Sequence, residues 1–226
     1  MSSERLPGKV LLEAKGKPLL GYVVERLQKN KNLDGIILAT SVDESDNPIA
    51  EHCKKWDIRC YRGPLENVAL RFIETVDQYQ LDAFVRISAD SPWIDPQLID
   101  QMVGAFRSGA YDIVTNVLDR TFPKGESVEV IRTSVFKRAY PNMNRPEDFE
   151  HVTNYFYRNL KQFKIFNLRS QNPNLAKVNL CVDTQEDFNR FFLAIEQAQK
   201  FSVDLNWQGV AKIYENLQNP MPTCLN

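Results

Sequence analysis

The sequence is poor in the residues that build disulfide frameworks, histidine sites and membrane spans. Its 226 residues include four cysteines without a CxxC pair and only two histidines, which are His52 and His151. This scarcity favours free thiols in a reducing compartment, and it argues against a histidine-rich zinc site or a Ser-His-Asp triad. Apolar runs reach only a few residues, whereas a membrane helix needs roughly 20, and the first residues lack the apolar core of a signal peptide. We therefore expect a cytoplasmic protein without a membrane span.

The chain also lacks an excess of charge of either sign. It has 28 basic and 29 acidic residues, a net charge of −1, whereas duplex-binding proteins rely on a surplus of lysine and arginine. No nucleic-acid partner is therefore expected. With 43% hydrophobic and 25% charged residues, the composition is typical of a globular protein. The length suits one α/β domain over residues 1–226, with a core large enough to need no disulfide or structural metal.

Short apolar runs alternate with helical patterns along the first half of the chain. The predicted strands are Ile36–Ala39, Ile58–Tyr61, Ala83–Ser88, Asp112–Asn116, Val128–Arg132, Lys164–Leu168 and Val178–Val182. Predicted helices begin near Pro18, Pro48, Leu65, Pro96, Thr133, Pro146, Thr184 and Trp207. This early alternation implies a mostly parallel, Rossmann-like sheet covered by helices on both faces. The rhythm changes from about residue 117 to 170, which predicts a small mixed lobe for substrate binding or for dimerisation.

Glycine is scarce, but three of the nine glycines fall within the first 21 residues. Gly8 lies between Arg5 and Lys9, ahead of the first predicted helix. A glycine lets the backbone approach a ligand closely, and a cationic loop before a helix can hold phosphate oxygens through N–H groups and charge. The alternative interpretation of this segment is a solvated chain end.

Two acidic residues follow predicted strands, at the carboxyl ends where ligands bind in open parallel sheets. Strand alternation puts Arg86, Ser88 and Asp90 on one side, and Asp183 follows the strand over 178–182. Carboxylates at such positions suit Mg²⁺, which binds one or two of them together with substrate phosphates. The alternatives are a turn role for Asp90 and a helix-capping role for Asp183. His151, in the predicted lobe, is either a substrate contact or a structural residue.

Taken together, six segments resemble the cytidylyltransferase family over essentially the whole chain. They are Arg5-Leu6-Pro7-Gly8-Lys9, Gly16-Lys17-Pro18-Leu19-Leu20, the run from Arg86 to Pro96, Val128-Glu129-Val130, Glu150-His151-Val152-Thr153 and the run from Val182 to Asp187. The sequence most resembles the spore-coat polysaccharide biosynthesis branch, which is similar to the enzymes that make CMP-sialic acid and CMP-KDO. The resemblance implies a fold of the nucleotide-diphospho-sugar transferase type, Mg²⁺ dependence and CTP as donor. In the implied reaction a hydroxyl group of an acidic sugar attacks the α-phosphate of CTP, and pyrophosphate leaves.

The resemblance also implies a role for particular residues. Those implied in catalysis are Arg5, Lys9, Asp90 and Asp183, with the two aspartates holding the metal. Those implied in nucleotide binding are Arg5, Leu6, Pro7, Gly8, Lys9, Arg71 and Ser88. The substrate-binding candidates are Arg86, Glu129 and His151. Arg86 is assigned from its position, because a guanidinium can grip a sugar carboxylate through two parallel hydrogen bonds.

The sequence departs from the family pattern at several points. An apolar strand ending in Gln-Ala-Arg usually precedes the first loop, but Met1 falls inside the motif, so a first strand is expected to be missing. A misassigned start, a truncated chain and an unanchored loop are the alternatives. Ala89 replaces a glycine, while Asn67 and Ser127 replace acidic residues. Two other functions stay open, namely use of another nucleotide such as UTP or GTP, and non-catalytic binding of a sugar nucleotide.

Overall fold

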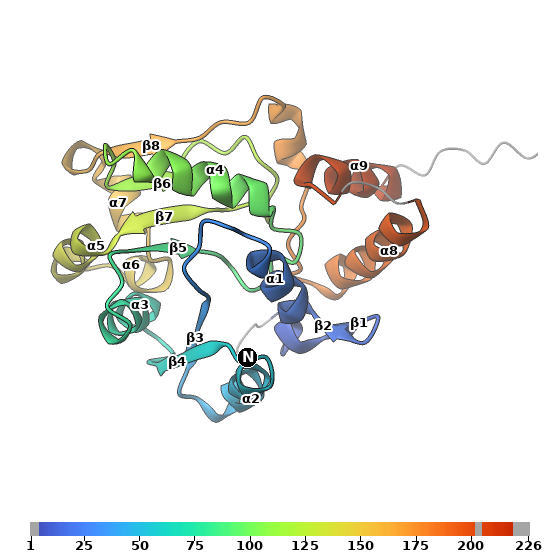
Figure 1. The fold of residues 1–226 in the computed structure, drawn as a ribbon, viewed down its shortest axis with the longest axis horizontal. Coiled ribbons are helices and arrows are strands. Elements are labelled where there is room, and N and C mark those ends of the chain that lie inside the picture. The colour runs from blue at the N-terminus through green and yellow to red at the C-terminus, as the bar shows by residue number, and fades with distance from the viewer. Residues whose placement is uncertain (1–4, 202–204, 219–226) are drawn as a thin grey trace, which may run out of the picture.

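The computed structural model describes residues 5–201 and 205–218, which form an α/β fold (Figure 1). Its α-helices are α1 (Leu19–Gln28), α2 (Asn47–Lys55), α3 (Val68–Gln78), α4 (Pro96–Arg107), α5 (Thr133–Ala139), α6 (Pro146–Glu150), α7 (Asn154–Arg158), α8 (Gln185–Phe201) and α9 (Trp207–Gln218). Its strands are β1 (Glu13–Ala14), β2 (Lys17–Pro18), β3 (Ile37–Ser41), β4 (Arg59–Gly63), β5 (Ala83–Arg86), β6 (Ile113–Thr115), β7 (Glu129–Arg132) and β8 (Ile165–Asn167). The predicted α/β class is confirmed.

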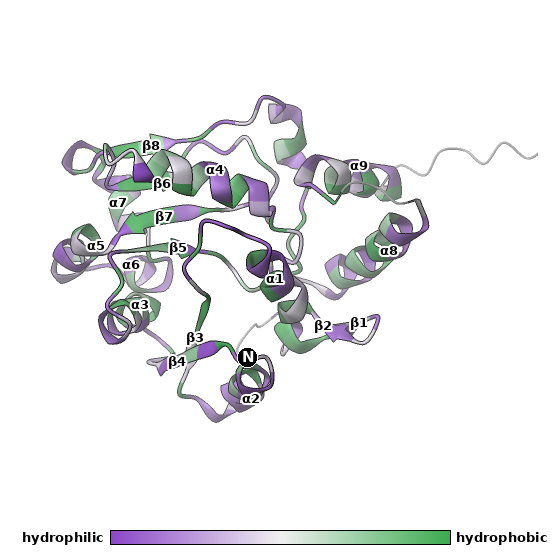
Figure 2. Ribbon diagram, in the orientation of Figure 1, coloured by the Kyte–Doolittle hydropathy of each residue, from purple (hydrophilic) through white to green (hydrophobic). Residues whose placement is uncertain are grey.

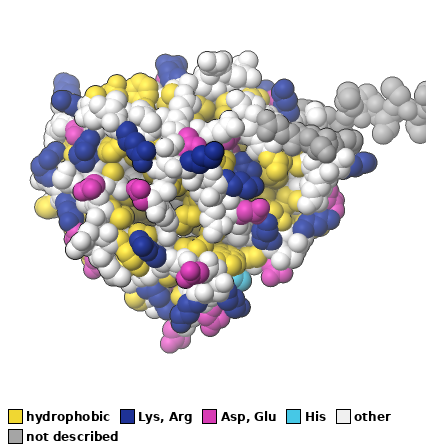
Figure 3. All heavy atoms as spheres, in the orientation of Figure 1, with side chains coloured by type: hydrophobic (Ala, Val, Ile, Leu, Met, Phe, Trp, Pro, Cys, Tyr) yellow, Lys and Arg dark blue, Asp and Glu magenta, His cyan; other side chains and the backbone are white. Residues whose placement is uncertain are grey.

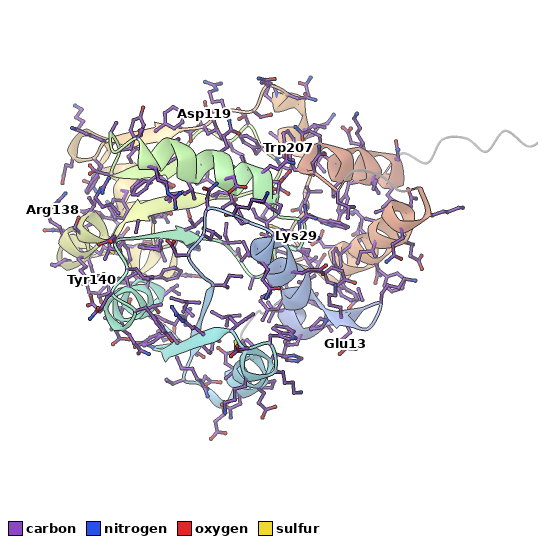
Figure 4. All side chains as sticks on the ribbon, in the orientation of Figure 1. Glu13, Lys29, Asp119, Arg138, Tyr140 and Trp207 are labelled. Carbon is purple, nitrogen blue, oxygen red and sulfur yellow. The ribbon has the colours of Figure 1, made fainter. Side chains whose placement is uncertain are left out.

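Side-chain caps explain where several helices begin. The Asp95 carboxylate accepts a hydrogen bond from the Gln97 amide at 2.8 Å, and Pro96 follows as the first residue of α4. The second carboxylate oxygen of Asp95 accepts from the Trp207 amide at 2.9 Å, which fixes the start of α9 against α4 (Figure 4). Asn67, which stands where the family has an acid, caps α3 by accepting from the Leu70 amide at 2.8 Å.

The larger sheet has the strand order β5-β7-β6-β8, and α4 lies across it (Figure 1). β7 runs antiparallel to both of its neighbours, while β6 and β8 are parallel, so this sheet is mixed. Its central strands are closed to solvent, since Ile113, Val114 and Ile131 are fully buried and Val130 is nearly so. Residues 117–170 supply β7 and β8 to this sheet, and the role of the segment as a lobe stays a prediction.

A cavity separates this sheet from the second one, in which β3 pairs in parallel with β4 and, among the described residues, with no other strand. The cavity measures about 1420 Å³, and β3 and β5 both line it together with α1 and α3. Figure 1 shows how these four elements are arranged, and Figure 2 shows hydrophobic residues along β3 and β7. No strand lies between β3 and β5 within residues 5–201 and 205–218. The prediction that the sheet lacks a first strand agrees with this arrangement.

Two predicted elements differ from the structure. The segment 178–182 is extended but forms only an isolated bridge, between Asn179 and Lys124, because its partner is a loop rather than a strand. The helix predicted from Pro146 is interrupted between α6 and α7, where Val152 has a φ of 29°. Positive φ is unfavourable for a β-branched residue and is incompatible with a continuous right-handed helix.

Other expectations concern cysteines and membranes. Three of the cysteines, Cys53, Cys60 and Cys181, are free thiols, and Cys224 lies outside the described residues. Among the helices of the described ranges, none has the length and apolarity that crossing a bilayer requires.

Candidate functional site

Two carboxylates from distant parts of the chain meet at one ammonium group. The Lys9 Nζ atom donates to Asp90 Oδ2 at 2.7 Å and to Asp183 Oδ1 at 2.8 Å. Lys9 begins the short 3₁₀ helix Lys9–Leu11, Asp90 lies in the loop after β5, and Asp183 lies just before α8. Arg5 adds a second cation, 3.3 Å from Asp183 Oδ2. The structure thus brings together the four residues that the sequence proposes for catalysis.

Backbone hydrogen bonds hold the two aspartate loops side by side. The Val182 amide donates to the Asp90 carbonyl at 3.0 Å, which links the residue before Asp183 directly to Asp90. Asp187 in the first turn of α8 accepts from the amides of Asp183 and Thr184, at 3.2 and 3.0 Å. The Ser88 hydroxyl donates to Asp90 Oδ1 at 2.7 Å. Asp187 is therefore the capping residue, and the Asp183 carboxylate is left to face the cations.

The loop ahead of Lys9 depends on glycine. Gly8 has a φ of 70° and a ψ of 9°, a left-handed conformation that residues with a Cβ atom rarely adopt. Its carbonyl accepts from the Leu11 amide at 2.9 Å, so the chain turns into the 3₁₀ helix at this point. Leu6 packs against the main hydrophobic core, whereas Pro7 is exposed. This turn directs the Lys9 side chain toward the aspartates.

The charges of the cluster stabilise one another. Burial alone would raise the pKa of Asp183, but hydrogen bonds from Lys124 and Lys9 outweigh it and lower this pKa to about 2. Burial opposes the charge of Lys9 in turn, and Asp90 and Asp183 raise the pKa of its ammonium above the ordinary value. The partners of Asp183 and Lys9 therefore favour the ionised form of both groups.

The donor set fits a magnesium ion. Asp90 and Asp183 each direct an oxygen at a single cationic centre, the Lys9 ammonium, which shows that the two carboxylates can share one cation. Mg²⁺ prefers oxygen ligands and commonly binds one or two carboxylates while keeping water or phosphate at its other positions. No group of three or more His, Cys, Asp or Glu side chains suited to a metal occurs in the described part of the chain. Phosphate and water oxygens would therefore complete the shell.

Lys124 is a member of the cluster that the sequence did not reveal. Its Nζ atom lies 2.8 Å from Asp183 Oδ2, and this hydrogen bond raises the pKa of Lys124. Backbone hydrogen bonds position it, since the Lys124 amide donates to Val178 and its carbonyl accepts from Leu180. Gly125 permits this approach, because a Cβ atom there would lie 2.8 Å from the Leu180 carbonyl carbon. The sequence signal is limited to a Pro-Lys-Gly turn, and only the tertiary contact joins it to Asp183.

The proposed substrate residues Arg86 and Glu129 form a pair beside this cluster. Arg86 donates to Glu129 Oε2 at 2.6 Å, and the Tyr157 hydroxyl donates to Glu129 Oε1 at 2.6 Å. Glu129 is only 2% exposed, whereas the Arg86 side chain keeps 27% of its surface exposed. Burial, followed by the nearby Glu129 charge, raises the pKa of Tyr157, so this phenol stays a hydrogen-bond donor. Arg86 is thus the member of the pair that a ligand can reach.

Two other residues predicted for the site, Arg71 and His151, form no hydrogen bond or ion pair with the cluster of Lys9, Asp90 and Asp183 in the described residues. Arg71 lines the cavity together with Gly8, Lys9 and Ser88, and its Nε atom is buried without a hydrogen-bond partner. Burial lowers the pKa of Arg71, with Asp46 opposing this effect. His151 is exposed after α6, and no hydrogen bond or ion pair joins its imidazole to the aspartates within the described residues. The structure therefore places Arg71 in the cavity that Gly8 and Lys9 also line, and it leaves His151 outside the cluster.

Comparison with solved structures defines the class of this fold. A cytidylyltransferase from Leptospira borgpetersenii superposes with a TM-score of 0.86 and 27% identity, covering 97% of this chain and 91% of that one. A CMP-2-keto-3-deoxy-manno-octonic acid synthetase complexed with CTP gives 0.64 and 17% identity, covering 87% and 95%, and shows the fold alone. The chain therefore has a nucleotidyltransferase fold.

Comparison of sequences defines the family. The cytidylyltransferase family model matches residues 1–217, so the chain belongs to that family. It is 30% identical over 196 residues to a spore coat polysaccharide biosynthesis protein of Bacillus subtilis, covering 83% of this chain and 80% of that protein. It is also 33% identical over 206 residues to an uncharacterised protein of Methanocaldococcus jannaschii, with coverages of 90% and 83%. The predicted family is thus confirmed.

Proposed function

We propose that this protein transfers CMP from CTP to a hydroxyl group of a sugar and releases pyrophosphate. The observation that carries the proposal is the meeting of Asp90 and Asp183 at Lys9, beside a glycine loop, in a chain of the cytidylyltransferase family. Transfer of a nucleotidyl group develops negative charge on phosphate oxygens, so catalysis rests on positioning and on cations. The cluster supplies basic residues that neutralise this charge and carboxylates that can position a metal ion.

In this proposal the basic residues bind the triphosphate. Lys9 exchanges its carboxylate partners for phosphate oxygens, and Arg5 and Lys124 add charge around it. Asp90 and Asp183 hold Mg²⁺, which polarises phosphoryl oxygens when bound. The Nε atom of Arg71, which is buried without a hydrogen-bond partner, offers a further hydrogen bond to the nucleotide.

The acceptor is proposed to be an acidic sugar for a surface polysaccharide or glycan. Arg86 supports this class because its guanidinium is partly exposed while Glu129 and Tyr157 fix its position. Glu129 has both oxygens engaged, so it acts in this scheme by orienting Arg86 rather than by touching the sugar. His151 stays a candidate contact for the remote end of the substrate.

The free thiols support a cytoplasmic location, and a homodimer stays a prediction.

A nucleotide panel tests the proposal. We expect ~1 mM CTP with Mg²⁺ to raise the melting temperature more than UTP, GTP or ATP does, because a ligand that binds only the native state stabilises it. Pyrophosphate release is then measured with CTP and a series of sugars with and without a carboxylate. Equal shifts for every nucleotide would count against a cytidine site. A CTP-specific shift without turnover of any sugar would favour the non-catalytic alternative.

Two variants assign the roles of the aspartates. Asp90→Asn and Asp183→Asn are each expected to lower turnover at least ~10²-fold, because each removes charge from the metal that stabilises the transition state. Asp77→Asn, on the exposed side of α3 where Asp77 pairs with Lys137, is the matched control and should keep its rate. Unchanged turnover in either site variant would remove that residue from the metal site.

A further inference from the structure

The Lys9 ammonium fills the point where the Asp90 and Asp183 carboxylates converge. Its Nζ atom lies 2.7 Å from Asp90 Oδ2 and 2.8 Å from Asp183 Oδ1, so these two oxygens share it. A metal ion that binds the same two oxygens needs the position of the ammonium, because two cations placed together repel each other strongly. Lys9 and a metal ion therefore compete for one place.

The remaining oxygens of the two carboxylates are occupied as well. Asp90 Oδ1 accepts from the Ser88 hydroxyl at 2.7 Å, and Asp183 Oδ2 accepts from Lys124 at 2.8 Å. Arg5 lies 3.3 Å from the same Asp183 oxygen. A cation that approaches either aspartate therefore has to displace a partner that is already bound there.

The cluster as a whole has a local surplus of positive charge. Lys9, Arg5 and Lys124 are three cations, whereas Asp90 and Asp183 are two anions. The whole chain has a net charge of −1, and basic and acidic side chains are interspersed over the face that Figure 3 shows. A divalent cation that enters while the three basic groups stay in place meets repulsion, whereas a triphosphate is attracted.

Lys9 also compensates two carboxylates that are sheltered from water. The exposed fraction of the side chain is 13% for Lys9, 19% for Asp90 and 10% for Asp183. The hydrogen bond from the Val182 amide to the Asp90 carbonyl keeps the two acids side by side. Two carboxylates at such close quarters need a cation, since each disfavours the charge of the other. Lys9 is that cation while no nucleotide is bound.

The backbone of Lys9 is fixed, but its ammonium group can move. The Lys9 amide donates to the Leu6 carbonyl at 3.1 Å, and the Lys9 carbonyl accepts from the Leu12 amide at 3.2 Å. The charge of a lysine lies at the end of a flexible stem with rotatable donors. A change of rotamer therefore takes the ammonium away from the aspartates while the loop keeps its backbone hydrogen bonds.

We infer that Lys9 fills the metal position in the nucleotide-free protein, and that a divalent metal ion binds Asp90 and Asp183 only when a nucleotide triphosphate has drawn the Lys9 ammonium away. This inference rests on the proposed function, because it states how the two ligands of that site depend on each other. The triphosphate offers oxygens to Lys9, and the two carboxylate oxygens that Lys9 leaves can then bind the metal. By linkage, nucleotide and metal each raise the affinity for the other by the same factor.

Binding of Mn²⁺ to the nucleotide-free full chain tests the inference. Mn²⁺ suits the same oxygen ligands as Mg²⁺, and its binding is measured by electron paramagnetic resonance. Lys9→Met removes the ammonium from the shared position. Lys124→Met is the matched control, because it removes one positive charge from the same Asp183 without vacating that position. The double variant Lys9→Met/Asp90→Asn shows whether the metal binds at the aspartates.

We expect Lys9→Met to bind Mn²⁺ roughly 10–100-fold more tightly than the wild type, a typical size for coupling between ligands. Lys124→Met should gain no more than about 5-fold, because Lys124 is 52% exposed and its charge is screened. The double variant should lose the gain. Equal affinity in Lys9→Met and the wild type, or an equal gain in Lys124→Met, would overturn the inference.

Two further measurements keep the test independent of how well Lys9→Met folds. Without metal, this variant should melt at a lower temperature than the wild type, and Mn²⁺ should restore its stability, because the sheltered carboxylates regain a cation. In the wild type, Mn²⁺ should bind more tightly with saturating CTP than without it. Equal Mn²⁺ affinity of the wild type in both conditions would overturn the inference without any variant.

Failure of the proposed function has a different signature. It appears as an unselective nucleotide panel or as a lack of pyrophosphate release, whereas the Mn²⁺ titration of the nucleotide-free variants involves neither CTP nor a sugar. A gain of Mn²⁺ affinity in Lys9→Met alone would support Lys9 as the occupant of the metal position even if CTP is not the substrate. Lack of Mn²⁺ binding by all variants would overturn the inference together with the metal role of the aspartates.

Discussion

The two halves of the molecule contain similar apolar strands but bury them to different degrees. In the closed half, β6 and β7 have neighbours on both edges, and Ile113, Val114 and Ile131 are fully buried. In the open half, β3 has one neighbour among the strands that the structure describes, and its apolar residues Ile37 and Leu38 keep part of their surface in contact with solvent. An apolar run therefore forms a strand in either setting, but its burial depends on what lies beside it.

The candidate site lies on the boundary between these halves. Lys9 lines the cavity of the open half, and Asp90 follows Ser88 and Ala89, which also line it. On the other side, backbone hydrogen bonds hold Lys124, and the Asp183 amide donates to the Asp187 carboxylate. The ion pair of Lys9 with Asp183 crosses this boundary. The stability of the open half and the geometry of the site are consequently linked through this contact.

The largest expected effect is the difference in stability between two variants, each of which shortens one apolar side chain in one half of the molecule. Ile131→Ala in the closed half should cost about 2–5 kcal/mol of unfolding free energy, because it leaves a cavity among fully buried side chains. Leu38→Ala in the open half should cost about 1 kcal/mol, because part of that side chain is already exposed to water. Denaturant unfolding of both variants measures the difference. Equal costs would break the comparison and indicate that something closes the cavity in solution.

Local patterns were sufficient to predict most of the fold. Helical spacing, Asp95 as a cap and Pro96 as a first helical residue place α4, and short apolar runs place β3, β5 and β6. The expected lack of a first strand agrees with the absence of a strand between β3 and β5 in the described part of the chain. Errors arose where tertiary contacts decide the conformation, as at residues 178–182, which lie extended against the Lys124 turn, and at Val152, which interrupts a helix.

The acidic residues of the site were predictable from the sequence, but its basic residues were predictable only in part. Asp90 and Asp183 each follow an apolar segment, and this pattern is visible in the sequence alone. Lys124 has no such mark, because its contact with Asp183 spans 59 positions and depends on the packing of Gly125 against Leu180. Asn67 shows the reverse case, since the sequence marks it only as a departure from the family pattern, whereas its side-chain oxygen caps α3 by accepting from the Leu70 amide.

A smaller effect is expected in the pH dependence of stability, which tests how much the Asp183 ion pairs contribute to the folded state. The pKa of Asp183 is about 2, below its ordinary value of 3.8, so its ion pairs stabilise the folded state above pH ~4 and are lost as the pH falls through ~2. We expect the loss of stability between pH 4 and 2 to be smaller in Asp183→Asn than in the wild type, by at most about 2 kcal/mol. Thermal unfolding across this range measures both curves, and parallel curves would contradict the assignment.

The smallest expected effect separates a structural role of Lys124 from a role in phosphate binding. Its side chain is 52% exposed, so Lys124→Gln should change the unfolding free energy by no more than about 1 kcal/mol, as for other solvent-exposed ion pairs. If Lys124 holds triphosphate oxygens, the same variant should weaken CTP binding roughly 3–10-fold, and the loss should shrink at high salt because the interaction is screened. Lys177→Gln is the control, since Lys177 is 75% exposed and lies 3.9 Å from Glu215, away from the aspartates. Titration calorimetry at two salt concentrations measures the CTP affinity of both variants. Equal CTP affinity would restrict Lys124 to holding Asp183 in place. A salt-dependent loss of CTP affinity in Lys124→Gln alone would assign Lys124 to the triphosphate.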